Sequence, residues 1–170
     1  MPDAETLEQL TTKDGLRTLA QTHGIPAPQT YILGQPKHDR DDPANGESEI
    51  EAIARDVRYP AILKPTESTY WHTPEITQLL RRGLIAARAK VLLCHNPQEL
   101  LDAYRQIAAY DDRMVVQEVI PGEDSRLVYF SCYLDRESQP LGIFGGRKHR
   151  VIPTGFGSAT AVGAAGDDLL

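Results

Sequence analysis

The chain places charged and amide side chains at the ends of apolar runs that are typical of β-strands. The clearest case is Lys64, which closes the run YPAILKP at residues 59–65. An ammonium group is costly to bury without a partner. A lysine that a buried strand delivers to its own end therefore either reaches solvent or meets an anion. For Lys64 taken alone, both interpretations are open.

Two further segments share this arrangement. In VVQEVIPGED, residues 115–124, the polar side chains of Gln117, Glu118 and Asp124 lie in or just after an apolar strand. In isolation, acidic residues around a PGED turn are ordinary turn residues. In GGRKHR, residues 145–150, four basic side chains follow one another. Such a run is, by itself, typical of a solvated face.

Strand alternation divides these four basic side chains into two sets. It places Arg147 and His149 on one face of the strand, and Lys148 and Arg150 on the other. One face can then point at a polyphosphate while the other is solvated. If Lys64 comes from an opposite wall, cations flank a space that also has polar acceptors, as a bound nucleotide requires.

Composition narrows the classes of function. The chain has 170 residues and a formal net charge of −6. This charge argues against general nucleic-acid binding, which needs a basic excess to neutralise phosphates. The sequence has no Cys/His cluster of the zinc-binding kind, no P-loop and no GxGxxG after a strand. Cys94 and Cys132 lie in apolar runs, so we expect two buried free thiols.

The N-terminal residues and the lengths of the apolar runs bear on where in the cell the protein is located. The first ten residues, MPDAETLEQL, are acidic and lack the apolar region of a secretory signal. No apolar run approaches the roughly 20 residues that span a bilayer. We therefore expect a cytoplasmic protein with neither a membrane nor a nucleic acid as its partner.

Hydrophobic periodicity and the placement of proline and glycine predict an α+β, or mixed α/β, fold. The strands after residue 119 follow one another directly, which predicts a β-meander. The predicted helices are 13–24, 48–57 and 97–109, the predicted strands are 31–33, 61–64, 89–94, 114–119, 126–134 and 141–150, and the segment 34–46 is predicted to be an exposed loop. Residues 66–87 are predicted to be irregular at first, through STYWHTPE at 68–75, and then helical through ITQLLRR at 76–82.

Five segments, in this order, resemble the ATP-grasp superfamily, in particular the carboxylate–amine ligases related to the large subunit of carbamoyl-phosphate synthetase. They are LRTLAQTHGIPAPQTYIL, YPAILKP, AKVLLCHNPQELLDAY, MVVQEVIPGED and GIFGGRKHRVIPTGFG. The resemblance covers the chain from Lys13 to about Thr160. It implies an N-terminal helix and linker at 1–30, a small α+β lid subdomain at 31–113, and at 114–170 part of a larger antiparallel-sheet subdomain, with ATP held between the two.

The resemblance also implies roles for residues of the first segments. By position, Lys64 matches the strand lysine that meets the α- and β-phosphates of ATP. Lys13 matches a basic residue that often opens the preceding helix. Gln117 and Glu118 match the pair of residues around the adenine amino group.

The remaining positions follow the same carry-over. Val119 and Ile120 would supply backbone groups and an apolar wall, and Asp124 matches the acidic residue on the ribose hydroxyls. Arg147 or Lys148 matches the catalytic cation near the γ-phosphate or the acyl phosphate.

The sequence departs from the family pattern at two places. STYWHTPE, residues 68–75, stands where the family has a glycine-rich loop that covers the phosphates. The chain also stops before the carboxylates that hold Mg²⁺, so we expect the Mg²⁺ ligands to lie outside it and the chain to be inactive alone. We further expect residues 68–87 to be mobile, and residues 157–170 to be disordered or held by a neighbouring molecule.

The expected function is that of the ATP-binding part of a ligase, which activates a carboxylate as an acyl phosphate for attack by an amine. Its partners would be ATP, a small carboxylate, an amine and further copies of the chain. The alternative is a non-catalytic nucleotide-binding or regulatory module with the same fold.

Overall fold

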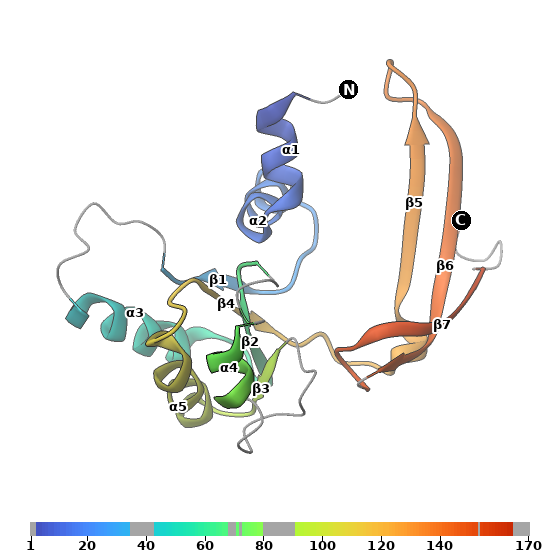
Figure 1. Ribbon diagram of the computed structural model, residues 1–170. Helices are drawn as coiled ribbons and strands as arrows, with labels where there is room; N and C mark the ends of the chain where they lie inside the picture. Colours follow the sequence, from blue (N-terminus) through green and yellow to red (C-terminus); the bar gives the residue numbers. More distant parts are fainter. Residues whose placement is uncertain are drawn as a thin grey trace. The chain divides into compact units, whose positions relative to one another are not determined.

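The computed structural model describes residues 3–34, 43–67, 71, 73–79, 91–152 and 154–164. The chain divides into two compact units, Met1–Ile120 and Pro121–Leu170 (Figure 1). The predicted α+β fold is confirmed, because helices and two antiparallel sheets make up the described chain.

The first unit is built around a four-stranded antiparallel sheet of order β1-β4-β2-β3. The subdomain boundaries predicted after residues 30 and 113 stay a prediction. Strand β4, which begins just after the second of these boundaries, lies in this first sheet. The strands are β1 (Thr30–Ile32), β2 (Ala61–Pro65), β3 (Leu92–Cys94) and β4 (Met114–Glu118), and the helices are α1 (Ala4–Thr11), α2 (Lys13–Thr22), α3 (Pro43–Asp56), α4 (Pro74–Leu79) and α5 (Pro97–Ala108).

One face of this sheet forms the hydrophobic core. Helices α3 and α5 lie beside one another and cover that face (Figure 1). Along β2, the side chains of Ala61 and Leu63 enter the core, whereas Ile62 and Lys64 belong to the opposite face. Alternation therefore removes Lys64 from the core without removing it from the sheet.

Capping residues explain where two helices begin. Asn96 caps α5 by accepting a hydrogen bond from the Glu99 N–H at 3.0 Å, and the Glu99 side chain accepts one from the His95 N–H at 2.8 Å. Thr12 caps α2 by accepting from the Gly15 N–H at 3.1 Å. The predicted starts of both helices are confirmed, and α2 ends just before Gly24, whose φ is +62°.

The structure corrects two further expectations. Helix α3 begins at Pro43, inside the segment predicted to be a loop, because proline suits the first turn of a helix. Both cysteines are free, but only Cys94 is buried, whereas Cys132 is exposed on a strand of the second unit.

The excursion after β2 is described in part. Trp71 and Ile76 from this segment are 3% and 1% exposed and pack in the core. The mobility expected for residues 68–87 stays a prediction. Residues 68–70, 72 and 80–87 lie outside the described chain, as do the first two residues of the strand predicted at 89–94.

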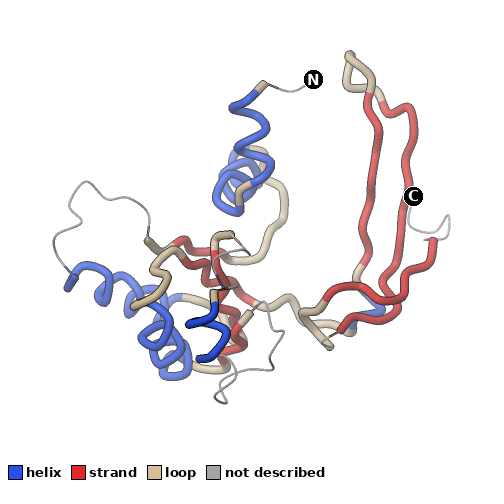
Figure 2. The backbone as a smooth tube through the Cα atoms, viewed as in Figure 1, coloured by secondary structure: helices blue, strands red, loops and turns tan. Residues whose placement is uncertain are grey.

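The second unit is a three-stranded antiparallel meander of order β5-β6-β7 (Figure 2). The sequence predicts a β-meander here, but not its third strand. Its strands are β5 (Val128–Leu134), β6 (Pro140–Ile152) and β7 (Ser158–Ala164), preceded by the 3₁₀ turn η3 (Asp124–Arg126). The expectation of disorder at 157–170 is wrong over β7, which pairs with β6. Residues 165–170 lie outside the described chain.

Candidate functional site

A chain of hydrogen bonds orients Lys64 on the non-core face of the first sheet. The Lys64 Nζ donates to Oε1 of Gln117 on β4 at 2.7 Å. The Gln117 Nε2 in turn donates to Oγ1 of Thr30 on β1 at 2.8 Å, and the Thr30 hydroxyl donates to the carbonyl of Pro28 at 2.8 Å. The two partners of Gln117 thus fix its amide with the oxygen toward the lysine.

The electrostatics around Lys64 favour an anion. Burial, and to a lesser extent the positive charge of Lys13, lower the pKa of Lys64 to about 8. Burial also lowers the pKa of Lys13, while Glu67 opposes that shift. In the described part of the chain, no carboxylate forms an ion pair with Lys64. An anionic ligand would stabilise the positive charge of both lysines and so oppose the lowering of their pKa values.

Lys13 stands at the start of α2 and reaches the end of β2. Its Nζ donates to the carbonyl oxygen of Thr66, immediately beyond Pro65. This contact brings α2 to the same end of β2 as Lys64. The structure therefore brings together three of the residues that the sequence singled out, namely Lys13, Lys64 and Gln117.

Glu118 ties β4 to the linker that precedes β1. Its Oε1 accepts from the Gln29 N–H at 2.8 Å, its Oε2 lies 3.4 Å from Nη1 of Arg58, and its own N–H donates to the Gln29 carbonyl at 2.9 Å. Both carboxylate oxygens are engaged within the protein. Glu118 therefore holds β4 against the linker that precedes β1. A ligand beside Glu118 would mainly contact the residues around it.

The next two residues continue from β4 to the end of the first unit. The Val119 N–H donates to the Pro60 carbonyl at 2.9 Å, so this N–H is already used by the protein. The side chain of Ile120 is 64% exposed and offers an apolar surface.

In the second unit, Asp124 and Arg147 hold the loops around the base of the meander. Asp124 opens η3, and its Oδ2 accepts from the Gly155 N–H at 3.4 Å. The Arg147 Nη1 donates to the Ser125 carbonyl at 3.2 Å. The backbone N–H of the neighbouring Lys148 donates to the Leu127 carbonyl at 2.8 Å.

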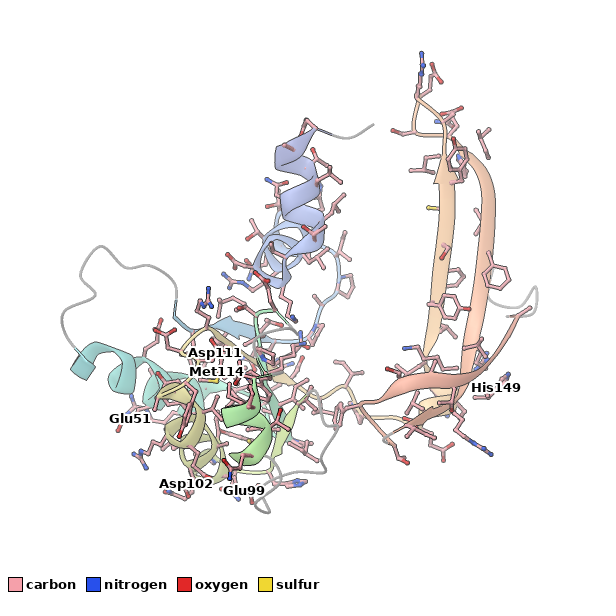
Figure 3. All side chains as sticks on the ribbon, in the orientation of Figure 1. Glu51, Glu99, Asp102, Asp111, Met114 and His149 are labelled. Carbon is pink, nitrogen blue, oxygen red and sulfur yellow. The ribbon has the colours of Figure 1, made fainter. Side chains whose placement is uncertain are left out.

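A β-bulge changes the predicted division of the basic side chains in β6. Arg147 pairs with Gly163 and Arg150 with Ala161, which lie two residues apart on β7, so both arginines share one face. The bulged residue His149 lies against Gly163, where an added Cβ would be 2.7 Å from its Nε2 (Figure 3). The expected pairing of Lys148 with Arg150 on one face is therefore wrong, whereas Arg147 and His149 share a face as expected.

The sequence did not indicate Thr30, Gln29 or Arg58 as parts of these networks. Their polar side chains stand in segments that are also typical of loops. Only the register of β1 against β4, which places Thr30 opposite Gln117, brings Thr30 to the site.

No family model matches the chain, and no curated protein matches it. Within the described residues, no group of three or more His, Cys, Asp or Glu side chains is placed to hold a metal ion. None of the described helices has both the length and the apolar character needed to cross a membrane.

Proposed function

We propose that this chain is the ATP-binding part of an ATP-grasp ligase. In the proposed reaction, a carboxylate oxygen attacks the γ-phosphorus of ATP and ADP leaves, which forms an acyl phosphate. An amine then attacks the acyl carbon, and phosphate departs with the electron pair of the broken C–O bond. The substrates are thus a small carboxylate and an amine or similar nucleophile.

The observation that carries the proposal is the Lys64 group of the first unit. The two cations lie close enough for the charge of Lys13 to lower the pKa of Lys64, and burial lowers the pKa of both lysines. No carboxylate of the described residues forms an ion pair with Lys64. Phosphate oxygens would offset the cost of these two buried charges through charge-assisted hydrogen bonds. Gln117 adds an amide beside the cations, which suits recognition of a nucleotide.

The second unit supplies the remaining roles in the proposal. Asp124 would accept from ribose hydroxyls, and Arg147 or Lys148 would stabilise charge on the transferred phosphoryl group. The bulge adds Arg150 to the face that Arg147 shares with His149. The two arginines together form a stronger cationic surface than the sequence pattern predicted.

Mg²⁺ is the usual counter-ion of ATP in phosphoryl transfer. The described residues offer no clustered set of ligands for it. We therefore assign no Mg²⁺ ligand and derive no step through the metal. A cytoplasmic location, where ATP is available, completes the proposal.

Calorimetric titration of the chain with ATP, with and without Mg²⁺, tests the proposal. We expect weak binding with little dependence on Mg²⁺ and no hydrolysis. Since no Mg²⁺ ligand is assigned in the described residues, ATP lacks the contacts that a bound metal would supply. Each such charge-assisted contact is worth on the order of 1.5–3 kcal/mol of binding free energy. Lys64→Met should weaken binding at least about tenfold, which corresponds to roughly 1.4 kcal/mol. The matched control is Arg136→Gln, in the exposed turn between β5 and β6.

The outcomes separate the candidate functions. No ATP binding, or equal binding by the Lys64→Met chain, would overturn the proposal. ATP binding without any ligation, in a protein that contains this chain, would instead support the alternative of a nucleotide-binding module.

A further inference from the structure

Lys64 has the surroundings of a reactive amine as well as those of a phosphate ligand. Its Nζ is held by one hydrogen bond, to Gln117 at 2.7 Å, and Gln117 is itself fixed by Thr30. The side chain is half-buried, so reagents in solution still reach it. A lysine oriented in this way beside a second cation is the arrangement that activates lysine nucleophiles.

We propose that Lys64 is a site of covalent acylation, at which a small acyl phosphate transfers its acyl group to the lysine amine. The neutral amine attacks the carbonyl carbon, a C–N bond forms, and the C–O bond to phosphate breaks. Phosphate leaves with the electron pair of that bond, and the nitrogen loses a proton to phosphate or solvent. The product is an N-acyl-lysine, and no oxidant or reductant is needed.

The ionisation of Lys64 supports this reactivity. With a pKa of about 8, the neutral fraction at pH 7 is roughly 300-fold larger than that of an ordinary lysine. A lower pKa also reduces intrinsic nucleophilicity, as it does for thiols with a Brønsted slope of about 0.5, so a net gain of roughly tenfold remains.

The charged groups around the amine favour an acyl donor that is also an anion. Lys13 from α2 is the cation that acts on Lys64, and Glu67, just after β2, acts on Lys13. Gln117 from β4 is neutral. Lys13 can therefore attract the phosphate end of the donor while the Lys64 amine attacks its carbonyl group.

This inference extends the proposed function, because that reaction makes an acyl phosphate near the phosphate-binding lysines. Acylation would remove the positive charge of Lys64 and so weaken the nucleotide site. A build-up of acyl phosphate without an amine acceptor would then inactivate the site.

The test uses acetyl phosphate with the chain alone, without nucleotide. Acetylation of each lysine is measured by mass spectrometry of peptides over pH 7–10, beside a short unstructured peptide that contains one lysine. We expect Lys64 to react about tenfold faster than the peptide lysine at pH 7. Its rate should level off above about pH 8, whereas the peptide rate should rise to about pH 10.

Variants at Lys13 test the role of the second cation. Lys13→Met should slow the acetylation of Lys64, Lys13→Arg should preserve it, and the Arg136→Gln control should leave it unchanged. Circular dichroism shows whether each variant is folded. If Lys64 reacts no faster than the peptide, or if the folded Lys13→Met chain reacts as fast as the original, the inference is wrong.

A last arm adds ATP before acetyl phosphate. Protection of Lys64 shows that nucleotide and acyl donor share the site. Rapid acetylation without protection supports the inference while overturning the role of Lys64 in the proposed function, so the two failures are distinguishable.

Discussion

Lys64 holds its position in the sheet at a cost to the stability of the fold. Burial depresses its pKa to about 8, so the folded chain binds fewer protons than the unfolded chain between pH 8 and the ordinary lysine value of 10.5. The free energy of unfolding therefore rises with pH through that window, and the destabilisation by Lys64 is fully present below it. A residue kept despite such a cost is typical of a functional site.

The first prediction concerns Lys64→Met. At pH 7 the variant should have a free energy of unfolding about 1 kcal/mol higher, a figure discounted for the partial exposure of the lysine. The advantage should shrink between pH 8 and pH 10.5, where the original lysine becomes neutral. Urea unfolding at several pH values measures it, and a lower stability at pH 7 would contradict the argument.

The second prediction concerns Asp111, which is 7% exposed and lies in the first unit (Figure 3). Burial raises the pKa of its carboxyl, although the N–H and charge of Arg113 oppose the shift. The indole of Trp71 lies near, yet its Nε1 and the Asp111 Oδ2 are buried without a hydrogen-bond partner among the described residues.

Because the folded state holds this proton more tightly than the unfolded state, stability should fall as pH rises from the ordinary aspartate range through the raised pKa. Asp111→Asn should flatten this dependence. Unfolding free energies from pH 3 upward test it, with Glu51→Gln at an exposed position of α3 as the control. A pH profile unchanged by Asp111→Asn would reject the assignment.

At the scale of elements, close packing across β5 and β6 makes a third prediction. Tyr129 lies opposite Gly146, where an added Cβ would be 2.3 Å from the Tyr129 ring. Gly146→Ala should destabilise the second unit by about 1–3 kcal/mol through overpacking.

Two variants make this prediction specific. Gly142→Ala on the same strand is the control, because an added Cβ there meets nothing within 4 Å. In a double-mutant cycle, Gly146→Ala should lower the free energy of unfolding much less in a Tyr129→Ala background, because the ring is then absent. Additive effects of the two substitutions would show that the ring is not the obstacle.

The elements also show what sequence patterns predict well. Helix α5 was predicted closely because Asn96, Pro97 and an apolar stripe agree on its start and its buried face. Strand β7 was missed because SATAVGA is rich in small residues and lacks alternating bulky side chains. The bulge at His149 was missed because strict alternation assumes regular pairing.

The candidate site was predictable in its chemistry and less so in its contacts. Lys64 and Gln117 were singled out by their places at the ends of apolar runs. Their mutual hydrogen bond depends on the register of β2 against β4, which places Ile62 opposite Gln117 and Lys64 opposite Val115. Register of this kind is set by long-range pairing and not by local spacing.

At the scale of the whole molecule, the second unit exposes an unusual amount of apolar surface. The exposed side chains on its hairpin are Val128, Phe130, Tyr133, Leu134, Leu141, Ile143 and Phe144, at 39–72% of their full areas. In the described sheet, β5 and β7 are edge strands. Exposed apolar surface beside free edges favours pairing with other chains.

The fourth prediction is therefore concentration-dependent self-association of this chain. Light scattering should show a mass that rises with concentration and that salt does not abolish, because the contact is apolar. Phe130→Lys should reduce association, whereas Ile25→Lys, at an exposed apolar position in the first unit, should not. A single monomeric species at millimolar concentration would count against the prediction.

Trp71 gives the two units different optical signals. It is the chain's only tryptophan, and it is buried in the first unit. Indole emission therefore reports the first unit alone, whereas the far-ultraviolet signal includes the strands of both. If the two emission and dichroism curves coincide during denaturation, the units unfold together. If the curves separate, the same experiment yields the stability of each unit in one intact chain.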